Sequence, residues 1–276
     1  MTSMSGEMRV IGVCVTGASH KLAGKPCQDN IKVNRVFKKD MTLLAVADGH
    51  GSDKSPFSEE GSKIAVDVFH TIISAAFKKH KNDINKLGTF LHREGDTTIA
   101  KEIEKEWKSR VRKSHRVNNR SNDDDIKSDF NLWRQYGSTL LGLLITSSFY
   151  FAFQLGDGDI LLLTENRAEH IISGDKQLGV DTHSLCHDES WRKAITQVRH
   201  RHDDVTPHAF MLTTDGFSNS YPDEEMFLKT CCEYYTAINL HGTNTVWGRL
   251  QRWLEETSEK GSGDDISVLI ACDKKL

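Results

Sequence analysis

The stretch Met41-Thr42-Leu43-Leu44-Ala45-Val46-Ala47-Asp48-Gly49-His50-Gly51 carries the pattern on which the fold of this chain depends. Its first part is almost wholly apolar and runs directly into an Asp-Gly pair. A short apolar run that ends in this way predicts a buried strand, and the glycine permits a sharp exit from it. Such a strand would deliver the Asp48 carboxylate to one edge of a sheet.

The same pattern recurs elsewhere in the chain. Two further apolar runs end in an Asp-Gly pair and a third begins directly after an Asp-Asp pair, at residues 151–159, 210–216 and 264–272. Carboxylates that meet at one edge repel one another unless cations neutralise them. Clusters made only of oxygen ligands suit Mg²⁺ or Mn²⁺. The sequence therefore predicts a metal-dependent enzyme.

The order of the remaining elements predicts the fold class. Strands are expected at residues 8–16, 31–37, 41–47, 136–146, 149–155, 160–164 and 266–272, with 31–37 and 41–47 forming a hairpin. Amphipathic spacing predicts helices at residues 56–79, 98–115, 224–238 and 246–259. Runs of strands followed by runs of helices favour an α+β sandwich over an alternating parallel fold. We expect one domain spanning residues 1–276.

Composition excludes several classes of protein. The net charge of −3 gives no electrostatic reason to expect nucleic acid or acidic membranes as partners. The six cysteines include no Cys-x-x-Cys, which favours a reducing compartment. The first residues lack the apolar core of a signal peptide, and no run approaches the roughly 18 apolar residues of a membrane span. We expect a soluble, cytoplasmic monomer.

Three polar stretches have no assigned role. The basic stretch 107–120 could dock a phosphoprotein or nucleic acid, but Asp123-Asp124-Asp125 follow closely, which favours a solvated helix face. Residues 118–130 are expected to form a loop, and residues 183–207 are ambiguous. The chain has no Gly-x-Ser-x-Gly and no P-loop, so serine-hydrolase and nucleotide-kinase interpretations have no support.

The segment from Asp48 to His50 suits a metal site with a proton donor beside it. One aspartate can bridge two cations with its two oxygens, the carbonyl of Gly49 can also reach a cation, and His50 can donate a proton. An Asp-Gly pair after a strand is usually only a turn. Here Asp29 begins the strand whose hairpin partner ends at Asp48, and Asp215 and Asp264 also lie at strand ends.

The chain resembles the metal-dependent serine/threonine phosphatases of type 2C, the PPM family, and is most similar to a bacterial branch of it. Six motifs carry the resemblance, in the order of the family and across nearly the whole chain. They are Cys27-Gln28-Asp29-Asn30, Ala47-Asp48-Gly49-His50-Gly51, Gly137-Ser138-Thr139, Gly156-Asp157-Gly158-Asp159, Thr214-Asp215-Gly216 and Gly261-Ser262-Gly263-Asp264-Asp265-Ile266-Ser267.

The resemblance implies an α-β-β-α sandwich of two mostly antiparallel sheets, with two Mn²⁺ or Mg²⁺ ions at one edge. It implies that Asp48 bridges both ions and that His50 is the general acid. The other implied ligands are Asp215 and Asp264 for one ion, the Gly49 carbonyl for the other, and Asp29 directly or through water. Asp157 would join Asp215 at a third, weaker ion.

Two departures from the family pattern concern substrate and metal binding. The arginine that grips the substrate phosphate in the family is replaced by Gly24. Lys25 or His20 could supply the positive charge, although lysine cannot form the forked contact of arginine. The glutamate before the first metal-site aspartate is replaced by Gln28, which carries no charge.

The predicted activity is hydrolysis of phosphoserine or phosphothreonine on proteins, with a cognate kinase as the opposing enzyme in signalling. Two alternatives stay open. One is an inactive relative that binds phosphoproteins as a scaffold, which the lost arginine favours and the retained carboxylates oppose. The other is a metal-dependent hydrolase of another phosphoester, such as a nucleotide.

Overall fold

The computed structural model describes residues 8–36, 41–118, 129–172, 183–201 and 208–273. Two five-stranded sheets lie face to face, and every strand pair within them is antiparallel. The first sheet has the order β1 (Met8–Val15), β10 (Ile266–Asp273), β9 (Ala209–Thr213), β6 (Asp159–Thr164) and β7 (Arg167–His170). The second has the order β2 (Asn30–Val36), β3 (Met41–Ala47), β4 (Leu140–Thr146), β5 (Phe149–Leu155) and β8 (Ile195–His200).

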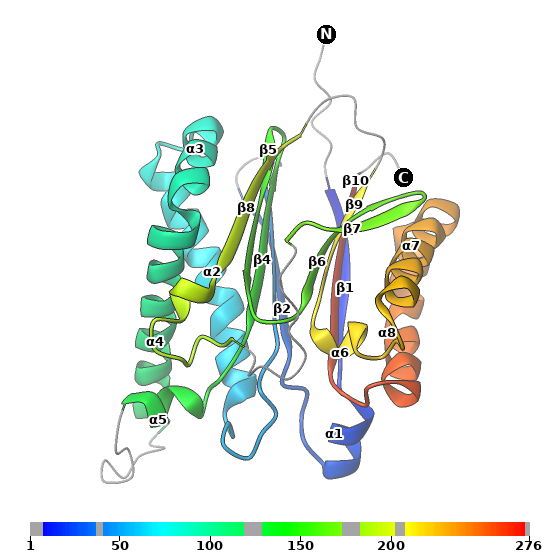
Figure 1. Ribbon diagram of the computed structural model, residues 1–276, viewed down its shortest axis with the longest axis horizontal. Coiled ribbons are helices and arrows are strands. Elements are labelled where there is room, and N and C mark those ends of the chain that lie inside the picture. The colour runs from blue at the N-terminus through cyan, green and yellow to red at the C-terminus, as the bar shows by residue number, and fades with distance from the viewer. Residues whose placement is uncertain (1–7, 37–40, 119–128, 173–182, 202–207, 274–276) are drawn as a thin grey trace.

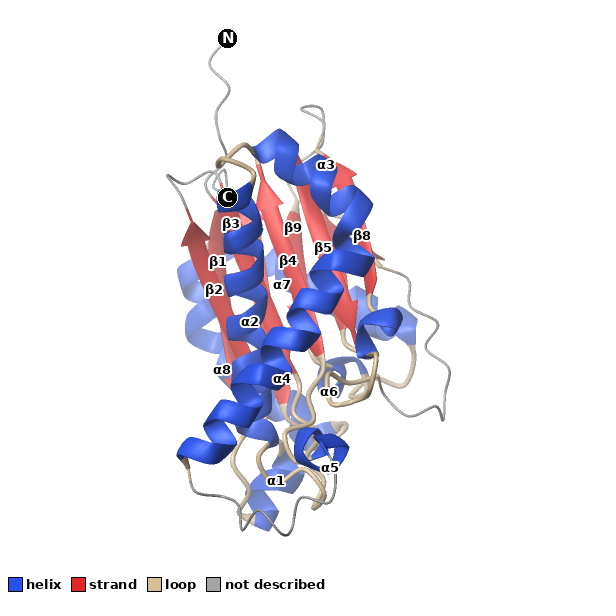
Figure 2. Ribbon diagram, turned by 90° about the vertical axis from the view of Figure 1, so that its left-hand side faces the viewer, coloured by secondary structure: helices blue, strands red, loops and turns tan. Residues whose placement is uncertain are grey.

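Helices cover the outer face of each sheet (Figure 1). The second sheet is covered by α2 (Ser58–Lys79), α3 (Ile84–Glu94) and α4 (Ala100–Val117), as Figure 2 shows from the side. The first sheet is covered by α7 (Glu224–His241) and α8 (Thr243–Lys260). Short helices α1 (Ala18–Ala23), α5 (Asp129–Arg134) and α6 (Asp215–Ser218) lie toward the lower end of the sandwich in Figure 1. The expected α-β-β-α sandwich is confirmed.

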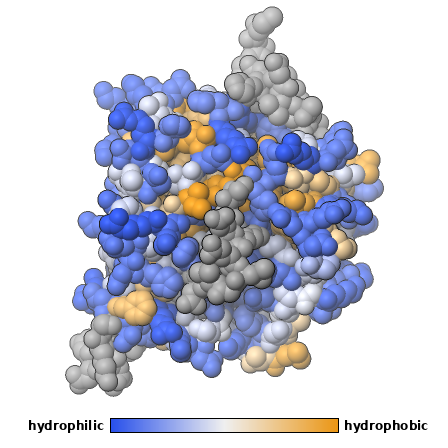
Figure 3. Space-filling view, viewed as in Figure 1, coloured by the Kyte–Doolittle hydropathy of each residue, from blue (hydrophilic) through white to orange (hydrophobic). Residues whose placement is uncertain are grey.

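The core has three apolar layers because each sheet is buried on both faces. Side chains such as Leu44, Leu143 and Phe210 fill the space between the sheets. Phe69 and Trp107 pack between the second sheet and its helices. Every residue of β3, β4 and β5 is buried, which explains why these strands appear in the sequence as unbroken apolar runs and not as alternating ones. On the surface, the face in Figure 3 is largely hydrophilic over the helices.

Several elements were not expected from the sequence. Helix α3 and the π-helical turn Gly95–Ile99 precede α4, which begins two residues later than predicted. Strands β7 and β8 are edge strands with polar, half-exposed residues, so they lack the apolar signal of the central strands. Most of the loop expected at residues 118–130 lies outside the described residues, and α5 begins at Asp129.

The basic stretch that begins at Trp107 is only partly solvated. Trp107 is buried and its Nε1–H donates to the Gly61 carbonyl at 2.9 Å. Lys108 pairs with Glu104 at 2.6 Å and Arg110 with Glu106 at 2.7 Å, so acids one turn earlier neutralise part of the charge. In the described parts of the chain, no helix has the length and apolar character that a membrane span needs.

Candidate metal centre and active site

Carboxylates that follow three different strands meet at one edge of the sandwich. Asp48 follows β3, Asp157 follows β5, and Asp215 begins α6 directly after β9. Ligand oxygens of these three residues all lie within 4.8 Å of one another. Asp29 and Asp264 are outside the group that meets this limit among the described residues, but their negative charges still act on Asp48.

Burial and mutual repulsion favour the protonated form of several of these aspartates when no cation is bound. Desolvation, followed by repulsion from the neighbouring aspartates, raises the pKa of Asp48 well above its ordinary value. The same causes raise the pKa of Asp29 to about 8 and that of Asp215 to about 7. Burial is also the main cause of the raised pKa of Asp264. A divalent cation would remove both penalties by supplying opposite charge.

The donor set fits Mg²⁺ or Mn²⁺. The cluster consists of carboxylate oxygens, which these hard ions prefer. Asp29 Oδ1 and Gln28 Oε1 are buried beside it and have no hydrogen-bond partner among the described residues. Asp29 Oδ2 accepts a hydrogen bond from Thr214 Oγ1 at 2.8 Å, which fixes the direction of that carboxylate. Orphaned buried oxygens of this kind are suited to a cation or its water ligands.

The Gly137-Ser138-Thr139 motif holds the loop from Asp48 to His50 in place. Thr139 N–H donates to the Asp48 carbonyl at 2.9 Å, and Asp48 N–H donates to Thr139 Oγ1 at 3.0 Å. Gly49 pairs with Ser138, and His50 N–H donates to the Gly137 carbonyl at 3.1 Å. A Cβ on Gly137 would lie 2.1 Å from His50 Cδ2, so only glycine allows the imidazole to pack there.

His50 lies in a partly buried position. Burial lowers its pKa below the ordinary value of a histidine, and the nearby His187 lowers it further, whereas Asp157 raises it. His187 therefore lies close enough to His50 to act on it, and it belongs to the segment of residues 183–191. This segment is tied to the same motif, because Ser138 O accepts hydrogen bonds from Ser184 Oγ and Leu185 N–H, each at 3.0 Å. The polar sequence of residues 183–191 did not indicate that this segment lies near His50.

The two candidate phosphate-binding residues lie on the loop between β1 and β2. Lys25 Nζ donates to the Gly51 carbonyl at 3.1 Å and lies 3.5 Å from the exposed Asp53. His20 Nδ1 lies 2.9 Å from Asp265 Oδ1. Gly24 has a φ of 65° and ends α1 in the left-handed conformation. That backbone explains a glycine where the family arginine would stand, and an arginine introduced there would be strained.

Comparison with known proteins places the chain in a family. The family model described as protein phosphatase 2C matches residues 16–256. No curated protein sequence matches the chain. Among solved structures, the serine-threonine phosphatase 2C of Toxoplasma gondii superimposes with a TM-score of 0.63 at 13% identity, covering 97% of this chain and 95% of that one.

Two bacterial structures show the same likeness. PppA of Pseudomonas aeruginosa, described as a key regulatory component of T6SS, has a TM-score of 0.60 at 16% identity and covers 96% of each chain. The serine/threonine phosphatase PstP/Ppp of Mycobacterium tuberculosis has a TM-score of 0.54 at 14% identity, covering 96% of this chain and 98% of that one. At such identities the likeness shows the fold alone. The family model spans most of the sequence, and the chain belongs to the protein phosphatase 2C family of serine/threonine phosphatases.

Proposed function

We propose that this chain hydrolyses phosphoserine and phosphothreonine on proteins and that the reaction needs two Mn²⁺ or Mg²⁺ ions. The observation that carries the proposal is the meeting of Asp48, Asp157 and Asp215 within 4.8 Å. Burial and neighbouring carboxylates raise the pKa of Asp48 and of Asp215, and a bound cation would oppose that shift. Asp48 would bridge the two ions, with Asp215, Asp264, the Gly49 carbonyl and Asp29 as the remaining protein ligands. Asp157 and Asp215 would hold a third, weaker ion.

The ions, when bound, supply a water of lowered pKa as nucleophile and offset charge on the phosphoryl oxygens. His50 would protonate the departing serine or threonine oxygen, which is a poor leaving group without a proton. Its backbone is held by Gly137 and its ring is packed against that glycine, so the imidazole is positioned before substrate arrives. No covalent intermediate on the protein is needed.

The proposed partners follow from the activity. The substrate would be a phosphorylated protein, and a cognate serine/threonine kinase would oppose the reaction. The monomeric state and the cytoplasmic location stay predictions from the sequence.

Turnover of a phosphoserine peptide, measured with Mn²⁺, with Mg²⁺ and with EDTA, tests the proposal. We expect turnover with either ion and none with EDTA. Nucleoside monophosphates and p-nitrophenyl phosphate in the same panel separate a protein phosphatase from a hydrolase of other phosphoesters. Binding of the phosphopeptide without turnover under every metal condition would contradict the proposal and support a scaffold role.

A further inference from the structure

We infer that His20, held in place by Asp265, is the group that binds the substrate phosphate in this chain. The inference rests on the proposed function and assigns a residue to the position that the missing arginine leaves open. It also gives Asp265, whose neighbour Asp264 is a proposed metal ligand, a separate role as a positioning residue.

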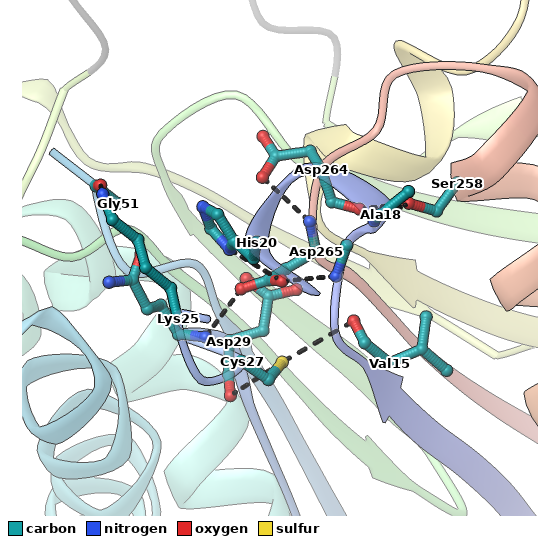
Figure 4. Close-up of polar contacts among 12 residues, drawn as sticks. Val15, Ala18, His20, Lys25, Cys27, Asp29, Gly51, Ser258, Asp264 and Asp265 are labelled. Atoms are coloured by element: carbon teal, nitrogen blue, oxygen red, sulfur yellow. Dashed lines mark hydrogen bonds and ion pairs between the residues drawn. The ribbon is translucent and has the colours of Figure 1, made fainter. Parts of the chain in front are cut away.

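Asp265 closes the loop that carries His20. Its carboxylate is buried and accepts backbone hydrogen bonds from Gly17 N–H at 2.7 Å and Gln28 N–H at 2.6 Å. These donors lie at the two ends of the loop, so a single side chain just before β10 ties both ends together. His20 lies between them and places Nδ1 2.9 Å from Oδ1 of the same carboxylate, as Figure 4 shows.

Helix α1 depends on such polar contacts because none of its residues is buried. Ser19 N–H donates to the Gly263 carbonyl at 2.9 Å, and Ala18 N–H donates to Ser258 Oγ at 3.1 Å. Both partners belong to the segment that leads into Asp264 and Asp265. The loop and the metal-site segment therefore form one hydrogen-bonded unit, which fixes the position of His20 relative to the proposed ligands.

The imidazole has one nitrogen left for a substrate. An acceptor carboxylate beside Nδ1 favours the proton on that nitrogen, which leaves Nε2 to face the other way. Nε2 lies 3.3 Å from the position that a Cβ on Gly51 would occupy. Gly51 ends the motif that carries Asp48 and His50, so the free nitrogen of His20 points toward the same loop as the catalytic groups. When both ring nitrogens carry a proton, the Nε2–H of the imidazolium can donate a charge-assisted hydrogen bond to a phosphate oxygen.

Lys25 is less suited to this task. Its ammonium group already contacts the Gly51 carbonyl and Asp53, and its side chain is 38% exposed. An exposed, flexible cation with two oxygen partners must give up one of them before it can bind a phosphate. His20 needs no such exchange, because its contact with Asp265 uses the other ring nitrogen.

Binding of inorganic phosphate to the Mn²⁺-loaded full chain, measured by calorimetry, tests the inference without turnover. His20→Gln should weaken binding roughly tenfold, the size expected for loss of one charge-assisted hydrogen bond. It should raise KM for a phosphopeptide by a similar factor, with a smaller change in kcat. Asp265→Asn should weaken phosphate binding as well, and the double variant should be no weaker than Asp265→Asn alone, because both changes act through one imidazole.

One variant on the same loop serves as a control, and another tests the alternative phosphate-binding residue. Lys21→Ala removes only the exposed pair with Glu255 at 3.2 Å, and it should leave phosphate binding unchanged. Lys25→Ala tests the alternative residue and should weaken phosphate binding clearly less than His20→Gln does. Each variant is first shown to be folded by its thermal unfolding curve. If Asp265→Asn does not fold, His20→Gln decides the question alone.

Three results would overturn the inference: unchanged phosphate affinity in His20→Gln, a loss in Lys25→Ala that matches or exceeds that of His20→Gln, or no phosphate binding by the parent chain. Additive losses in the double variant would remove Asp265 from the positioning role. A chain that binds phosphate through His20 but hydrolyses no phosphopeptide would refute the proposed function and leave this inference standing.

Discussion

The two adjacent aspartates that precede β10 have different hydrogen-bond partners. The carboxylate of Asp264 is close enough to Asp48 for its charge to raise the pKa of that residue. Asp265 accepts hydrogen bonds from backbone N–H groups of the β1–β2 loop, and its charge raises the pKa of Asp29. Chemically identical side chains therefore serve different purposes, and only their hydrogen-bond partners tell them apart.

Asp48→Asn should lower turnover of phosphopeptide by at least about 10²-fold, because a neutral amide cannot hold two divalent cations. The fold should survive, since one charge fewer relieves repulsion within the cluster. Steady-state kinetics with Mn²⁺ and thermal unfolding measure the two effects. The matched control is Asp67→Asn. Asp67 lies on α2 and pairs with Lys32 of β2. Parental turnover in folded Asp48→Asn would end the two-metal hypothesis.

His50→Gln should slow the release of serine far more than the release of p-nitrophenol, which departs without a proton. General acid catalysis contributes about 10²–10⁴-fold, so the ratio of the two kcat values should change by a factor in that range. The exposed His92 on α3 offers a control, His92→Gln, which should leave the ratio unchanged. An equal loss on both substrates would show that His50 is not the acid.

At the scale of elements, helix α4 holds the segment of residues 187–191, which lies beside the site. Glu104 Oε2 accepts hydrogen bonds from Ser190 Oγ at 3.0 Å and Trp191 N–H at 2.9 Å. Lys108 pairs with Glu104 and also donates to the His187 carbonyl at 3.0 Å. This largely buried pair anchors residues 187–191 and thereby places His187 near His50.

Lys108→Met keeps the length of the side chain but removes the donor to His187 and leaves Glu104 without its cation. Loss of one partner from a fully buried pair costs about 3–5 kcal/mol, so the segment should open more readily. We expect faster hydrogen exchange at residues 187–191 and a fall in kcat/KM of several-fold. Lys105→Met on the exposed side of α4 is the control. Unchanged exchange in Lys108→Met would show that α4 does not anchor the segment.

For the whole molecule, the carboxylate cluster links stability to metal and to pH. The folded-state pKa values of Asp29, about 8, and Asp215, about 7, exceed the ordinary 3.8. The unfolded chain therefore releases these protons near pH 4, while the folded chain keeps them to pH 7–8. Their contribution to stability is full below about pH 4 and is lost as pH rises through 7 and 8. Buried His70, with a pKa lowered to about 4, acts in the opposite direction only below pH 6.5.

The melting temperature of the metal-free chain should consequently fall between pH 6.5 and 8.5. Excess Mn²⁺ should raise it and reverse or flatten the slope, because ions at 100 times their Kd add about 2.7 kcal/mol to the free energy of unfolding. Thermal scans in EDTA and in Mn²⁺ across this range measure both effects, and Asp48→Asn in EDTA should show the shallower slope. A slope that Mn²⁺ leaves unchanged would contradict a metal site at this cluster.

Local patterns in the sequence determined the central strands and the sandwich class. β3, β4 and β5 were predictable because an unbroken apolar run needs burial on both faces wherever it lies. The Asp-Gly exits also placed Asp48, Asp157 and Asp215 at strand ends. Edge strands β7 and β8 were missed because their residues are polar and half-exposed, so their sequence does not require burial on both faces.

The tertiary structure alone decided which of these groups meet. It brought Asp157 within 4.8 Å of Asp48 and Asp215, left Asp29 and Asp264 beside that group, and directed Asp265 to the loop of His20. It also brought His187 near His50 from a segment with no recognisable signal. The contacts of Asp265 join residues 237 and 248 positions apart, and their geometry results from the packing of two sheets, which no local pattern of residues contains.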